Sequence, residues 1–147
     1  MVLLAPLAGA MLAGALGPRI LKGRAHWPVI FGVGGAFIGA IALFGFMRGA
    51  EHGHASIVAT IYQWFAPSSG QWFNIEVLVD PLTAVMLLVV TGISLLVVIY
   101  SRDYMREHGN PVQGYERFFA YLGLFVFSMC ALVLAGNFVL LYLGWEA

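Results

Sequence analysis

The sequence is poor in charged residues and in cysteine. Only 10% of its 147 residues are charged, whereas a soluble domain carries about 25%. The formal net charge is zero, which gives no reason to expect a nucleic-acid partner. Cys130 is the single cysteine, so the chain can form no internal disulfide and has no Cys-x-x-Cys pattern for zinc or an iron–sulfur cluster. These deficits argue against a soluble domain.

Long apolar runs fill most of the chain, which is 61% hydrophobic. The runs do not alternate, as the strands of a transmembrane barrel would, and several reach the length of a membrane-spanning helix. The sequence therefore predicts an all-α transmembrane helical bundle of about five helices, the fifth truncated. The expected helices cover residues 1–18, 27–47, 81–100, 117–135 and 137–147.

A secretory signal peptide is the alternative interpretation of the first run, because alanine and glycine are frequent in residues 1–18. A signal peptide carries its positive charges before the apolar run, and here they follow it, so a first transmembrane helix is predicted. Gly9 and Ala13, like Ala10 and Gly14, have the spacing that permits close helix approach. A helix this rich in small residues contains many such pairs by composition alone, so no packing role is assigned to them.

Residues 48–79 break the helical pattern. Residues 57–65 are apolar but too short to span a membrane, and after a Pro-Ser-Ser-Gly turn signal residues 72–79 alternate loosely. This pattern predicts a short extended or hairpin-like segment in an outer loop. His52 and His54 have no third ligand nearby, so solvated histidines are expected there rather than a metal site.

The start of the third run carries a helix-start signal. Asp80 is suited to cap the helix, and Pro81 fits the first helical position, where its missing N–H costs nothing. Thr83, Thr91 and Ser94 are the polar residues within the run. Their hydroxyls are expected to bond back to the same helix, so they do not indicate a conduction path.

Basic residues gather on one side of the predicted bundle. Five helices place residues 19–26 and 101–117 on one side, and the N-terminus, residues 48–78 and the turn at 136–137 on the other. The positive-inside rule then places both basic loops in the cytoplasm and the N-terminus outside. Six of the seven basic residues share the first side: Arg19, Lys22, Arg24, Arg102, Arg106 and Arg117.

Glu146 is the only charged side chain inside a strongly apolar run. It follows Asn137 by nine residues, which is ~14 Å along a helix and near the middle of a ~30 Å hydrocarbon core. A carboxylate at that depth costs roughly 2.5–3.5 kcal/mol on insertion scales and tends to mark an ion or proton path. The alternative is an interhelical hydrogen-bond partner without proton traffic.

The second half of the chain carries a recognisable set of motifs. They are Val-Asp-Pro-Leu at 79–82, Phe-Phe-Ala-Tyr-Leu-Gly-Leu-Phe-Val-Phe-Ser-Met at 118–129, Leu-Val-Leu-Ala at 132–135, and the run ending in Gly-Trp-Glu at 137–146. Together these motifs resemble the antiporter-like subunits of respiratory complex I, in particular subunit L of bacterial NADH-quinone oxidoreductase, the counterpart of mitochondrial chain 5. The chain as a whole is then a single N-terminal part, residues 1–147, of an antiporter-like membrane domain.

The resemblance implies a proton-translocating subunit of a multi-pass complex in the bacterial inner membrane. Glu146 is implied to belong to the proton-translocation machinery, paired in the family with a lysine on a later helix beyond Ala147, which stands where most members have glycine. Other membrane subunits, the lipid bilayer and protons are the implied partners. NADH, FMN, iron–sulfur clusters and quinone are expected in other subunits, with no cofactor or redox chemistry in this chain.

Three alternatives remain open. The nearest is the large subunit of a multi-subunit Na+/H+ antiporter, or a related membrane subunit of a hydrogenase or inorganic-carbon transport complex. A small membrane scaffold protein complete at 147 residues belongs to another class, and it would leave a terminal carboxylate in the hydrocarbon. A haem-bearing subunit has little support, because no histidine lies within a predicted spanning run.

Overall fold

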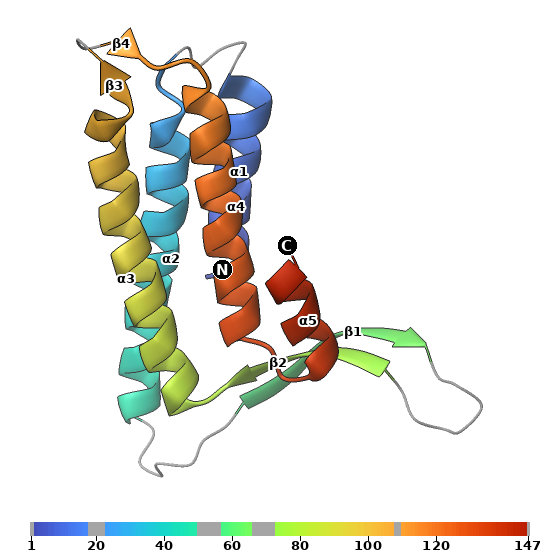
Figure 1. Ribbon diagram of the computed structural model, residues 1–147. Coiled ribbons are helices and arrows are strands. Elements are labelled where there is room, and N and C mark those ends of the chain that lie inside the picture. Colours follow the sequence, from blue (N-terminus) through green and yellow to red (C-terminus); the bar gives the residue numbers. More distant parts are fainter. Residues whose placement is uncertain (1, 18–22, 50–56, 66–72, 108–109, 147) are drawn as a thin grey trace.

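The computed structural model describes residues 2–17, 23–49, 57–65, 73–107 and 110–146. In that part of the chain four helices stand side by side, and a shorter fifth packs against the fourth (Figure 1). The helices are α1 (Leu4–Leu16), α2 (His26–Gly49), α3 (Pro81–Tyr104), α4 (Tyr115–Val133) and α5 (Phe138–Glu146). The predicted helical bundle is confirmed.

Two small hairpins lie at opposite ends of the bundle (Figure 1). Strands β1 (Ile57–Phe65) and β2 (Phe73–Val79) pair antiparallel, from Ile57 opposite Val79 to Phe65 opposite Phe73. This pairing confirms the hairpin-like segment predicted between the second and third helices. At the other end β3 (Arg106–Glu107) pairs with β4 (Asn110–Pro111).

Three of the described helices, α2, α3 and α4, are long and apolar enough to cross a membrane. Helices α2 and α3 have 24 residues each, about 36 Å of helix against a hydrocarbon core of ~30 Å. The helix α1 is shorter, with 13 residues. Large apolar side chains such as Phe31, Ile38 and Leu96 are more than two-thirds exposed, as expected for a surface that faces lipid.

Small residues bring α1 close to its neighbours. Gly9, Ala10 and Ala13 are all buried, and a Cβ added to Gly9 would lie 2.7 Å from the Pro28 carbonyl oxygen of α2. A Cβ added to Gly123 of α4 would lie 3.0 Å from the Ala10 Cβ. The expectation that these small-residue pairs have no packing role is therefore wrong, because helix backbones approach this closely only where side chains are small.

The helix ends differ from the predicted ones by a few residues. The third helix continues to Tyr104 instead of ending at residue 100, so part of the expected loop at 101–116 is its last turn, and another part is the β3–β4 hairpin. The fourth helix begins at Tyr115 and ends at Val133, two residues earlier than predicted at both ends. Hydropathy locates the apolar part of a helix but not its ends, because a helix can continue through charged residues such as Arg102.

The start of α3 is capped as predicted. The Thr83 N–H donates to Asp80 Oδ1 at 2.6 Å, and Pro81 occupies the first turn. The Thr91 hydroxyl donates to the Leu87 carbonyl at 2.6 Å, so it bonds back to its own helix. The turn at 67–70 and the pair His52/His54 lie outside the described residues.

Candidate functional site

The start of α5 is held by hydrogen bonds from the turn before it. Asn137 Oδ1 accepts a hydrogen bond from the Leu140 N–H at 3.0 Å, and the Asn137 carbonyl accepts from the Leu141 N–H at 3.1 Å. An asparagine that accepts in this way caps the helix, since the first-turn N–H groups have no partner within the helix. Asn137, which the sequence indicated only as part of a turn, is therefore the N-cap of α5.

The hairpin strand β2 fastens this turn to the bundle. The Gly136 N–H donates to the Glu76 carbonyl at 2.8 Å, and the Leu78 N–H donates to the Leu134 carbonyl at 3.0 Å. A Cβ on Gly136 would lie 2.9 Å from that Glu76 oxygen, so only glycine permits this approach without a shift. Residues far apart in sequence thereby determine where α5 begins.

Gly144 sets how α5 packs on α4. It is buried, and an added Cβ would lie 2.9 Å from the backbone nitrogen of Leu132 and 3.1 Å from its Cα. Both atoms belong to the α4 backbone, which cannot move aside as a flexible side chain does. A cavity of about 250 Å³ lies beside this contact, lined partly by Ser128, Leu132 and Trp145. The Gly-Trp-Glu motif thus begins with a helix–helix contact.

Glu146 lies on a face of α5 that turns away from this contact. Helical positions two apart do not face the same direction, and Trp145 and Glu146 are both exposed while Gly144 is buried. The last described turn of α5 lies about halfway along the bundle (Figure 1). Within the described part of the chain, the Glu146 carboxylate has no hydrogen-bond or ion-pair partner. The Glu146 side chain is therefore exposed, on a turn of α5 at about mid-length of the bundle.

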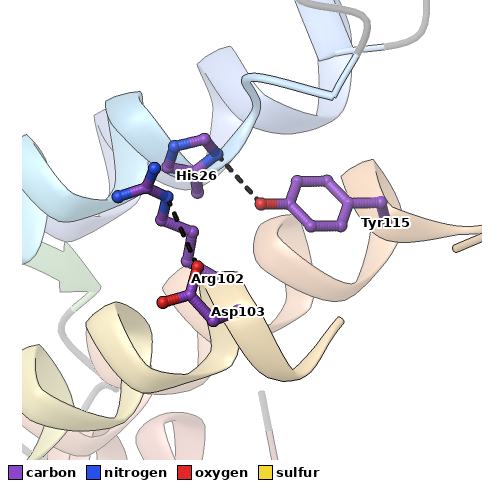
Figure 2. Close-up of polar contacts among 4 residues, drawn as sticks. All are labelled: His26, Arg102, Asp103 and Tyr115. Carbon is purple, nitrogen blue, oxygen red and sulfur yellow. Dashed lines mark hydrogen bonds and ion pairs between the residues drawn. The ribbon is translucent and has the colours of Figure 1, made fainter. Parts of the chain in front are cut away.

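A second polar cluster, which the sequence reasoning missed, lies at the end of the bundle that carries β3 and β4. His26 is 1% exposed, and its Nδ1 lies 2.9 Å from the Tyr115 hydroxyl (Figure 2). Arg102 and Asp103, 3.8 Å apart at the end of α3, lie beside this pair (Figure 2). The His26 Nε2 is buried and has no hydrogen-bond partner among the residues that the structure describes.

The His26–Tyr115 pair joins the start of α2 to the start of α4. The sequence does not predict this contact, for two reasons. His26 follows a run of basic residues, in the loop predicted at 19–26, although it is the first residue of α2 and is buried. Tyr115 is 89 residues away in the sequence, so a single sequence gives no sign of the contact. Among the described residues, no group of three or more potential metal ligands occurs, here or elsewhere.

The chain has relatives among respiratory membrane proteins. The sequence model of the family described as "NADH-Ubiquinone oxidoreductase (complex I), chain 5 N-terminus" matches residues 64–119. NADH-quinone oxidoreductase subunit L of Neisseria meningitidis serogroup A is 43% identical across 99% of this chain and 21% of that protein. Subunit L of Escherichia coli K12 is 38% identical across 84% of this chain and 20% of that protein.

Plastid and structural relatives extend this set. The chloroplastic NAD(P)H-quinone oxidoreductase subunit 5 of Physcomitrium patens is 50% identical across 50% of this chain and 10% of that protein. Among solved structures, the Mrp complex from Dietzia sp. DQ12-45-1b contains a chain with a TM-score of 0.69 and 26% identity, covering 99% of this chain and 14% of that chain.

The chain thus spans about a fifth of the length of the subunit L relatives that it matches. The matched relatives are subunits of multi-subunit complexes. With three helices of membrane-spanning length in its described part, the chain is part of a multi-pass membrane protein.

Proposed function

The chain belongs to the family of the chain 5 and subunit L membrane subunits of NADH-quinone oxidoreductase, and from this premise we propose that it takes part in proton translocation coupled to quinone reduction. The whole protein is then a subunit of a translocase, and the electron-transfer cofactors belong to other subunits. The proposed location is the bacterial inner membrane, with other membrane subunits of the complex as partners.

The observation that carries this proposal is the position of Glu146. The carboxylate lies on a helix whose start is capped by Asn137 and whose packing is set by Gly144, and the last described turn of that helix lies about halfway along the bundle (Figure 1). A carboxylate at this depth is costly unless it has a function or a partner. Its exposure leaves it accessible to groups that other parts of the full-length protein supply.

The chemistry of proton transfer follows from two opposing effects on a carboxylic acid. Removal from water favours the protonated form, whereas a nearby cation favours the ionised form. A cation that approaches and withdraws therefore makes the Glu146 carboxylate release and then take up a proton. Quinone reduction elsewhere in the complex acts on the site through a conformational change that moves this cation, and so shifts the carboxylate between its protonated and ionised forms.

The test is Glu146→Gln in the full-length protein within its complex. The amide keeps the shape of the side chain but carries no exchangeable charge, so proton pumping per quinone reduced should fall while assembly is retained. Asp103→Asn is the matched control, because it makes the same chemical change at a carboxylate that is exposed at the end of α3. A pumping stoichiometry in Glu146→Gln equal to that of the wild type contradicts the proposal.

The likeness to the Mrp complex supports one second candidate, the large subunit of a multi-subunit Na+/H+ antiporter. The two functions differ in their coupling. Membrane vesicles that contain the full-length protein should acidify on NADH oxidation under the first proposal, without any requirement for sodium. Proton movement that is driven only by a sodium gradient, and is indifferent to NADH, favours the antiporter.

The orientation in the membrane is also proposed. In Figure 1 the β3–β4 hairpin and the start of α2 lie at one end of the bundle, and the β1–β2 hairpin lies at the other. Arg24, Arg102 and Arg117 belong to the first end and Arg48 to the second. The positive-inside rule assigns the first end to the cytoplasm and the N-terminus to the outside.

A further inference from the structure

A groove follows the seam between the end of α1 and the start of α4. Its volume is about 910 Å³, and small residues hold the two helices close at this seam. A Cβ added to Gly14 would lie 3.4 Å from the Ala120 Cβ, and one added to Gly17 would lie 2.8 Å from the Glu116 Cβ. The residues that matter here are Gly14, Gln113, Glu116, Arg117, Ala120 and Tyr121.

The groove combines both signs of charge at one place. Glu116 and Arg117 are consecutive residues in the first turn of α4, and both line the groove. Among the described residues neither side chain has an ion-pair partner. Tyr121, one turn further along the helix, is 69% exposed. An arginine and a tyrosine near the end of a spanning helix are typical of the boundary between hydrocarbon and lipid headgroups.

We infer that this groove binds the headgroup of an aminophospholipid of the phosphatidylethanolamine type. The phosphate accepts hydrogen bonds from Arg117, the primary ammonium donates to Glu116, and an acyl chain follows the apolar surface beside Ala120. Charge-assisted hydrogen bonds of this kind are the strong ones. The inference concerns a surface of α1 and α4 and does not depend on the role of Glu146.

The charge pattern distinguishes this lipid from the other common ones. An anionic headgroup or free phosphate would pair with Arg117 but would bring negative charge next to the Glu116 carboxylate. The quaternary ammonium of phosphatidylcholine has no N–H group to donate. Only a headgroup with a phosphate and a primary ammonium offers a hydrogen-bonding partner to both side chains.

The test measures which lipids the full-length protein retains in its complex. The complex is placed in nanodiscs of phosphatidylcholine, alone or with phosphatidylethanolamine or phosphatidylglycerol, and the lipids that survive mild detergent release are counted by native mass spectrometry. Retention of phosphatidylethanolamine should exceed that of phosphatidylcholine by about tenfold, the factor expected for one charge-assisted hydrogen bond. Added inorganic phosphate should not displace the lipid.

Two substitutions separate the two contacts. Arg117→Gln should lower retention of all three lipids by about tenfold, whereas Glu116→Gln should abolish the preference for phosphatidylethanolamine over the other two lipids. Arg48→Gln is the control, because Arg48 lies at the end of the bundle away from the groove, and it should leave the retention of all three lipids unchanged. If Arg117→Gln fails to assemble, the lipid ratio in Glu116→Gln alone decides. The inference is overturned if the wild type retains phosphatidylglycerol preferentially, or if Glu116→Gln leaves the preference for phosphatidylethanolamine unchanged. It is also overturned if another protein segment covers the groove.

Discussion

The packing of Gly144 on α4 gives a prediction whose size follows from the geometry. In Gly144→Ala, the new methyl group would lie 2.9 Å from Leu132 N and 3.1 Å from Leu132 Cα, both closer than the roughly 3.4 Å at which such atoms ordinarily touch. The α4 backbone cannot yield, so α5 must shift outward by several tenths of an ångström. Overpacking of this kind costs about 1–3 kcal/mol.

The helix propensity of alanine opposes this overpacking cost and has to be subtracted from it. Alanine is a better helix former than glycine by about 1 kcal/mol, so the net loss for Gly144→Ala is about 0–2 kcal/mol. Gly45→Ala in α2 is the matched control, because an added Cβ there meets nothing within 4 Å and only the helix-propensity gain remains. The difference between the two variants isolates the overpacking.

The assay compares unfolding midpoints of the full-length protein and its two variants in the same detergent. Gly144→Ala should unfold below the wild type or close to it, while Gly45→Ala should unfold at or above it. The outward shift of α5 should also lower proton pumping per quinone reduced, because it moves Glu146 relative to its surroundings, and Gly45→Ala should leave that stoichiometry unchanged. Equal midpoints and equal pumping stoichiometries for the two variants would refute the reasoning.

Three further predictions concern other parts of the bundle. Asp80→Ala should lower the free energy of unfolding by about 1 kcal/mol, because α3 loses its cap. The hydrogen bond from the Thr83 N–H lowers the pKa of Asp80, so the cap stabilises the fold above the ordinary carboxyl pKa and this stabilisation is lost as pH falls through the lower folded value. The loss of stability on acidification should therefore be smaller in Asp80→Ala than in the wild type. Tyr115→Phe should cost about 1–3 kcal/mol, measured as a lower unfolding midpoint, because it leaves the buried His26 Nδ1 without its partner. In intact cells, a membrane-impermeant thiol reagent applied outside should label Ile57→Cys and spare Asp103→Cys, and the reverse pattern would invert the proposed topology.

Much of the bundle could be read from the sequence because hydropathy is a local property. The apolar runs, the Asp80-Pro81 start and the break at residues 48–79 each depend on neighbouring residues, and each corresponds to an element of the structure. Helix ends were less accurate, as the extension of α3 to Tyr104 shows. The role of Glu146 stays a prediction.

The sequence by itself determined that this chain forms membrane helices and roughly where each begins and ends, and it predicts a single carboxylate, Glu146, at mid-depth. Tertiary structure alone decided which glycines are contact points: the spacing of Gly9 and the motif of Gly144 do not say what each meets, and in the structure an added Cβ at Gly9, Gly136 or Gly144 would meet backbone atoms of Pro28, Glu76 or Leu132. It likewise decided that His26 is buried beside Tyr115. The physical reason is that hydropathy and capping act between neighbours along the chain, whereas close packing is a relation between distant segments.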